Sequence, residues 1–299
     1  MPAIARSTIV RGPAEATFNA IAYQAAQDIQ VDFSLETFDV PVGGSIQDKR
    51  LLDQISRVRL QPSGKIEGLA DLFAVLALPM GSTLFADTDK TLIVKNASRA
   101  ITFKSAGLIK PPVINASNRR TLFGEMEFAC IGQNNVAFGA AGSRMTHAAG
   151  GAAAGVASSD LITSPWTVGG AGLGANFETE DGVVVECIPT WEPYATDSNG
   201  VINYYLTDLD FRATFAPLIG VAAFLDAINI EFTRGASLNS LGVDLTLTNG
   251  SIDITLADAA IIDPKAAFAA NVSPIRQVVA VATRVNSTTA LGTVAVTAP

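Results

Sequence analysis

The chain has 299 residues, of which 48% are hydrophobic and 16% charged, enough apolar material for one large domain or two ordinary ones. Its formal net charge of −8 argues against a protein whose main task is to grip nucleic-acid phosphates, because that task needs a basic surface. The longest apolar stretches, 69–80 and 221–230, are each about half a membrane span and each contain an aspartate, so we expect no bilayer crossing.

In the first half of the chain, apolar residues alternate with polar ones in several runs, and such alternation predicts half-buried strands. These runs lie at 29–38, 54–61, 99–105 and 122–131. One segment has a different period: Leu69, Leu72 and Leu76 recur at helical spacing before Pro79, which predicts one amphipathic helix over 68–78.

An Ala, Gly and Ser run at 137–159 shows no periodicity and reads as a flexible connector. We therefore divide the chain into a first β domain at 1–136, a connector at 137–160 and a second β domain at 161–299. The second domain repeats the pattern of the first, with a second helical stripe at 220–228. Its predicted strands are 182–188, 208–216, 252–258 and 276–285.

The two halves correspond segment by segment. Residues 101–111 align with 254–264 without a gap, and 68–76 align with 220–228, at offsets of 153 and 152. Three further matches fall at offsets up to 155, among them Arg57 over Arg212. Collinear matches with so little drift indicate a tandem duplication of one mainly β domain.

The two halves differ in charge. Residues 1–150 hold 15 Lys/Arg and 13 Asp/Glu, whereas residues 151–299 hold 5 and 15, giving net charges of +2 and −10. One interpretation is that the first half of one chain packs beside the second half of the next, where opposite charges steer the contact. The other is neutral drift between duplicated surfaces.

Catalytic patterns are absent from the sequence, and we predict no catalytic, cofactor-binding or metal-binding residue. His147, the one histidine, falls in the connector, where we expect an exposed loop residue. Cys130 and Cys187 lie in strand-like runs, where a buried free thiol is the expected state. Gly170, Gly172 and Gly174 resemble part of a dinucleotide loop but lack the flanking strand and helix.

Two polar segments between strands are candidate contact loops, because large side chains on such loops gain most when a partner covers them. They are 41–52 and 189–203. Trp191 could instead fold back on its own domain. The candidate residues are Pro41, Ile46, Asp48, Lys49, Trp191, Tyr194, Asp197 and Asn199.

Three segments carry a family resemblance: 5–13, 57–64 leading to the helix, and 121–128. In them, and in its layout, the chain resembles the major tail tube proteins of long-tailed, siphovirus-like bacteriophages. The resemblance implies a β-sandwich or barrel with one flanking helix per domain. It also implies rings of six such domains around a DNA-wide lumen, stacked through long loops and terminal arms. Some members carry two domains per chain and build the ring from three chains.

The resemblance further implies a structural protein of the virion, assembled in the bacterial cytoplasm, whose lumen conducts DNA during ejection. Its partners would be copies of itself and tail components such as the tape measure, terminator and distal tail proteins. The segments 1–12 and 291–299 are candidate arms. Acids that alternate with apolar residues on strands are candidates for the lumen wall: Asp32, Glu36, Glu186, Asp208 and Asp210.

Alternative functions remain open at this point. Another tail component of related fold, such as a terminator or distal tail protein, would form a single ring rather than a tube. A carbohydrate-binding β-sandwich module would need an exposed aromatic platform, for which an aromatic content of 7% gives little support.

Overall fold

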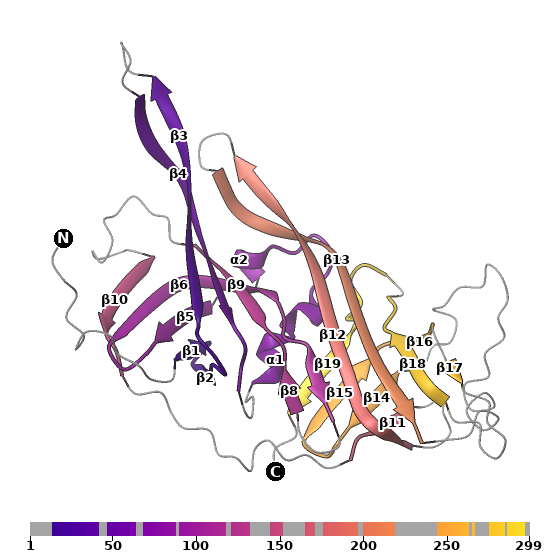
Figure 1. Cartoon of the computed structure of the whole chain (residues 1–299). Coiled ribbons are helices and arrows are strands. Elements are labelled where there is room, and N and C mark those ends of the chain that lie inside the picture. Colours follow the sequence, from indigo (N-terminus) through magenta and orange to yellow (C-terminus); the bar gives the residue numbers. More distant parts are fainter. Residues whose placement is uncertain are drawn as a thin grey trace.

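The computed structural model describes most of the chain as antiparallel β-structure, which confirms the mainly β fold class (Figure 1). Within the described residues, no helix is long and apolar enough to span a membrane. The described residues are 14–41, 47–63, 68–87, 90–117, 121–131, 144–151, 165–170, 176–196, 200–218, 244–262, 265–266, 275–284 and 286–296.

The first sheet is built from the first half of the chain and has eight strands in the order β2-β1-β5-β6-β9-β4-β3, with β10 paired to β6. The long hairpin β3/β4 forms one end of this sheet, and β3 is its terminal strand. The strand bounds are β1 Glu15–Phe18, β2 Ile21–Gln24, β3 Gln30–Pro41, β4 Gln47–Leu60, β5 Lys90–Lys95, β6 Arg99–Lys110, β9 Met126–Ile131 and β10 Met145–Ala149.

The second sheet has eleven strands, most of them from the second half, in the order β16-β18-β13-β12-β11-β14-β15-β19. The short strands β7 and β8 of the first half join it, because β7 pairs with the edge of β12. The strand bounds are β7 Ile114–Ala116, β8 Thr121–Phe123, β11 Thr167–Gly170, β12 Phe177–Thr196, β13 Gly200–Pro217, β14 Leu245–Thr248, β15 Ile252–Leu256, β16 Ala260–Ile261, β17 Lys265–Ala266, β18 Ile275–Val281 and β19 Gly292–Val296.

The pairing in the two sheets is equivalent, strand by strand. In the first, β1 pairs β5, β5 pairs β6 and β6 pairs β10; in the second, β11 pairs β14, β14 pairs β15 and β15 pairs β19. The registers also agree: Lys95 faces Ala100 across β5/β6, and Thr248 faces Asp253, each 153 residues later, across β14/β15. The offsets found in the sequence therefore also relate the backbone pairings.

A β-bulge falls at the same place in both long hairpins. The register of β3/β4 shifts between Glu36 and Thr37, and that of β12/β13 shifts between Thr190 and Trp191, 154 residues later. A bulge is specified by its local backbone and tends to persist within a family. Its recurrence at equivalent positions is a structural detail that the sequence alignment did not contain.

The helical segment lies between the two sheets. It consists of α1 (Leu69–Leu72) and a 3-10 turn, η2 (Ala74–Ala77), rather than the single helix predicted, because the α-helical turn ends at Phe73. The predicted apolar stripe is confirmed as buried, with Leu69 and Leu76 at 0% and 1% exposure. A further turn, α2, spans Leu84–Asp87. The second stripe, 220–228, lies outside the described residues.

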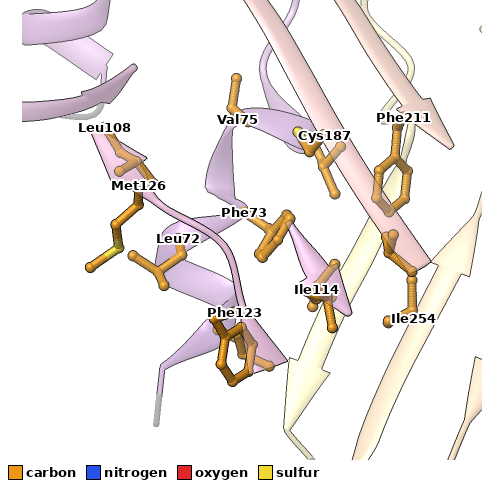
Figure 2. Close-up of a cluster of buried hydrophobic side chains, with 14 of the residues drawn as sticks. Leu72, Phe73, Val75, Leu108, Ile114, Phe123, Met126, Cys187, Phe211 and Ile254 are labelled. Carbon is orange, nitrogen blue, oxygen red and sulfur yellow. The ribbon is translucent and has the colours of Figure 1, made fainter. Parts of the chain in front are cut away.

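One continuous cluster of buried side chains joins both halves. Figure 2 shows Leu72 and Phe73 between Leu108 and Met126 on one side and Cys187 and Phe211 on the other. Because the helical segment of the first half also covers the inner face of β12, each half contributes to a shared core.

Two parts of the chain that were expected to be irregular contain strands. The connector at 137–160 contains β10, which pairs with β6 and is held by the buried side chain of Met145. His147 is exposed, as predicted, but lies on this strand and not in a loop. The candidate arm at 291–299 contains β19, and Leu291 is buried in the core. The candidate arm at 1–12 lies outside the described residues.

Candidate functional site

The candidate contact loops are largely the outer parts of two long hairpins. Figure 1 shows β3/β4 and β12/β13 extending from the sheets toward the same end of the molecule. Pro41, the last residue of β3, faces Gln47, and Asp48 and Lys49 lie on β4 opposite Val40 and Asp39. The loop prediction for these residues was wrong. A neighbouring strand can form the backbone hydrogen bonds of a strand even where its side chains are polar. Ile46 lies outside the described residues.

The second hairpin extends in the same way, with Trp191 and Tyr194 on β12 and not in a loop. Trp191 is half-buried and packs against the buried cluster of α2 and β4 as well as the main core. Trp191 is therefore not an exposed anchor, and it packs against the first half as well as against its own domain. Asp197 and Asn199 lie outside the described residues.

The exposed aromatic contact on this hairpin is a pair of tyrosines. Tyr194 on β12 and Tyr205 on β13 are 41% and 36% exposed. Their rings meet edge to face, with centroids 5.3 Å apart and planes at 63°. Sequence reasoning found Tyr194 but missed Tyr205, since only the strand register places the two rings together. A pre-formed aromatic pair of this kind is a suitable contact surface because little further ordering is required on binding.

Hydrogen bonds on the outer part of β13, close to the hairpin tip, fix the second hairpin to the first half. The amide of Phe85 donates to Asn203 Oδ1 at 3.1 Å, and Gly81 N donates to Leu206 O at 2.9 Å. Leu206 N in turn donates to Ser82 O at 3.0 Å. These bonds hold the hairpin at a set angle to the first sheet, so its outer part is a positioned arm.

A guanidinium group adds to this joint. Arg57 Nη2 donates to Tyr204 Oη at 3.2 Å, and its Cζ lies 5.4 Å from the centre of the Tyr204 ring. Arg57 and Arg59 also approach Glu127 at 3.5 and 3.1 Å. The hydrogen bond and the charge of Glu127 raise the pKa of Arg59. Arg59 therefore stays charged on the face of the first sheet that points away from the shared core, its outer face.

The candidate acids all occupy strand positions, and Asp32, Glu186, Asp208 and Asp210 lie on the outer faces of the two sheets. Asp32 faces Arg57 across β3/β4, and its equivalent Glu186 faces Arg212 across β12/β13. Asp208 and Asp210 lie four and two residues from Arg212 and share its face. Glu36 faces Asp53 across β3/β4, in the register position that Thr190 and Asp208 share across β12/β13.

These acids are not equally available. Arg212 Nε donates to Glu186 Oε2 at 2.8 Å, and its Nη1 lies 3.7 Å from Asp210 Oδ2, so one arginine offsets part of the charge of both. Asp32 and Asp208 are exposed. The outer face of each sheet is therefore mixed in sign, with acids and arginines on neighbouring strands.

Part of the first sheet's outer face is covered. Ile55 and Ala129 on this face are buried at 9% and 0% exposure under Leu84, Phe85 and Tyr204. Position 55 corresponds to Asp210 of the second sheet, whose side chain is 39% exposed. The two outer faces thus differ: the second is polar and open where the first is capped by α2 and the second hairpin.

The described residues offer little for catalysis. Cys130 and Cys187 are free and buried, as predicted, and burial raises the pKa of both thiols. No group of three or more possible metal ligands comes together in the part of the chain that the structure describes. A cavity of about 160 Å³ beside α1 is lined by Asp71, Lys90 and Trp191 among others. That volume is below the range of 300 to 1,000 Å³ typical of ligand pockets.

Comparison with known proteins adds no family to this picture. The sequence matches no protein-family model and no curated protein.

Proposed function

We propose that the chain is a structural subunit that polymerises with copies of itself, catalyses no reaction, and builds the tail tube of a long-tailed bacteriophage. The observation that carries the proposal is the equivalence of the two sheets, down to the bulge shared by their long hairpins. A duplicated unit of this kind lets a small number of chains close a ring of quasi-equivalent units, because each chain contributes two similar surfaces.

In the proposed tube, three chains form a ring of six units, and rings stack. The two hairpins point to the same end of the molecule, which suits contacts between successive rings. The net charges of +2 and −10 suit contact between the first half of one chain and the second half of the next. The virion location, and partners such as the tape measure, terminator and distal tail proteins, belong to this proposal.

Passage of DNA through the proposed lumen requires a wall without strong phosphate binding. Asp32 and Asp208 are exposed acids on the outer faces, and Arg212 is bound to acids of its own chain. An arginine held by two carboxylates attracts phosphate weakly, because its charge is already offset. The outer faces can therefore line a lumen although they contain arginines.

The decisive experiment combines electron microscopy of the purified protein with mass measurement of its soluble oligomer. Stacked rings with three chains per ring are the expected result. Single rings that never stack would favour a tail terminator. A chain that stays monomeric at all concentrations, or that binds immobilised glycans, would overturn the proposal.

The hairpin tips provide a second test. Replacing residues 195–202 by Asn-Gly joins the register partners Tyr194 and Asn203 through a two-residue turn and leaves Trp191 in the core. Replacing 40–48 joins Asp39 and Lys49 in the same way. We expect each shortened chain to form three-chain rings that no longer stack. Tubes of normal length from both variants would show that the hairpins do not connect rings.

A further inference from the structure

The contact between the two halves has an equivalent in the first sheet, at an edge that no described strand covers. Within the chain, β7 of the first half pairs antiparallel with the edge of β12, where Ile114 faces Val185 and Ala116 faces Val183. The strand equivalent to β12 is β3, since Val31 and Val58 face each other as Val185 and Ala213 do. In the first sheet, β3 is a terminal strand.

The strand equivalent to β7 also exists in the second half. β7 pairs with β8, just before β9, and β17 pairs with the beginning of β18. Because β9 and β18 are equivalent partners of β4 and β13, β17 occupies the place of β7 in the second sheet. The second half thus carries the pairing element, and the first half carries the edge that would receive it.

Burial supports this assignment. Val183, Val185 and Cys187 on the covered β12 are exposed by 2%, 0% and 5%. Their equivalents on β3 are more open, and Phe33, at the position of Cys187, is 42% exposed. An apolar side chain on an unpaired edge strand invites another strand, and proteins leave such edges open mainly where they use them.

We propose that β17 of one chain pairs antiparallel with the edge of β3 in a second copy of the chain, extending the first sheet of that copy. The equivalence places Lys265 and Ala266 opposite Gln30–Asp32, to within one residue. Lys265 then lies beside Asp32, and both side chains are exposed. This pair is a local attraction between opposite charges, and its sign is the reverse of the net charges of the two halves, +2 and −10.

The contact is heterologous, because it uses one surface from each end of the chain. When this contact repeats head to tail, all junctions between halves are equivalent. The junction within a chain pairs β7 with β12, and the junction between chains pairs β17 with β3. The proposal specifies the self-association on which the proposed function rests, but the register can be tested without assuming a tail tube.

Disulfide trapping tests the register directly. One chain carries Ala266→Cys and the other carries Gln30→Cys or Val31→Cys, the two positions that the equivalence allows. Oxidation of a mixture is expected to give a covalent dimer with one of these partners, whereas neither chain alone gives it. Ala148→Cys is a matched control, since residue 148 is exposed on β10, another edge of the same sheet. The double variant Asn115→Cys/Val184→Cys should give a disulfide within one chain and serves as the positive control.

Charge reversal gives an independent readout. Asp32→Lys or Lys265→Asp alone should weaken self-association by about two- to five-fold at low salt, and the two reversals together should restore it. If rings form normally but the Ala266→Cys chain crosslinks to neither partner and the double charge reversal does not restore association, the proposed strand pairing is overturned. The proposed function then still stands. A chain that never self-associates would overturn both.

Discussion

Replacement of Phe73 by alanine tests whether the two halves share one core. Phe73 is 3% exposed and lies between the first sheet and the inner face of β12 (Figure 2). Truncation of a buried phenylalanine to alanine costs about 3 to 5 kcal/mol, from lost apolar burial and the cavity left behind. If urea unfolding of a chain of this length has a slope of about 3 kcal/mol per molar, the midpoint falls by about 1 to 1.7 M.

Tryptophan fluorescence is the appropriate assay, because both tryptophans, Trp166 and Trp191, belong to the second half. Trp166 is fully buried, so its emission reports whether the second half is folded. A change at Phe73 in the first half should therefore move a signal from the second. Phe33→Ala, the same truncation at 42% exposure, is the control, and on the unassembled chain it should cost clearly less, about 1 to 2 kcal/mol. An unmoved tryptophan transition in the Phe73 variant would refute the shared core.

Three further changes probe the junction and the buried thiols. Arg57→Ala should lower the free energy of unfolding by about 1 to 2 kcal/mol through the lost hydrogen bond and ring contact, and a double-mutant cycle with Tyr204→Phe should show coupling rather than additivity. Cys130 and Cys187 should stay unmodified by a thiol reagent at pH 8 until urea unfolds the chain, because their raised pKa values keep them protonated; fast labelling of native protein would contradict their burial. Gly182→Ala, at φ +91°, places a methyl group against the backbone of β7 and should cost more than 1 kcal/mol by calorimetry, whereas Gly250→Ala, at φ +81° in open space, carries only the backbone strain.

The long, strongly patterned elements could be predicted from the sequence. Each predicted strand overlaps an observed one, and the helical stripe of Leu69, Leu72 and Leu76 is buried as its spacing required. Short strands such as β10 and β19 were missed because five-residue runs rich in Ala, Thr and Gly carry little periodic signal. Their neighbours β6 and β15 impose strand geometry on them by pairing.

The site residues were less predictable, and two aromatic positions show why. Trp191 and Tyr194 are three residues apart on one strand, so alternation places them on opposite faces: Trp191 turns into the core and Tyr194 stays exposed. The sequence interpretation placed both residues in a loop, where this alternation could not be applied. Tyr205 became part of the exposed pair only through the register of the hairpin.

The equivalent edge strands β12 and β3 have side chains of different size at one position, Cys187 and Phe33, and the difference matches how each edge is covered. At the covered edge, Cys187 is 5% exposed and belongs to the core cluster that also contains Phe73 and Ile114 (Figure 2). At the open edge, the same position holds the larger Phe33, which is 42% exposed. A bulky side chain at an open edge makes no steric clash within its own chain. It gains stabilising apolar burial when a second chain covers it. The small Cys187 and the large Phe33 are therefore the side chains expected if β12 is covered by a strand of its own chain and β3 by a strand of another chain.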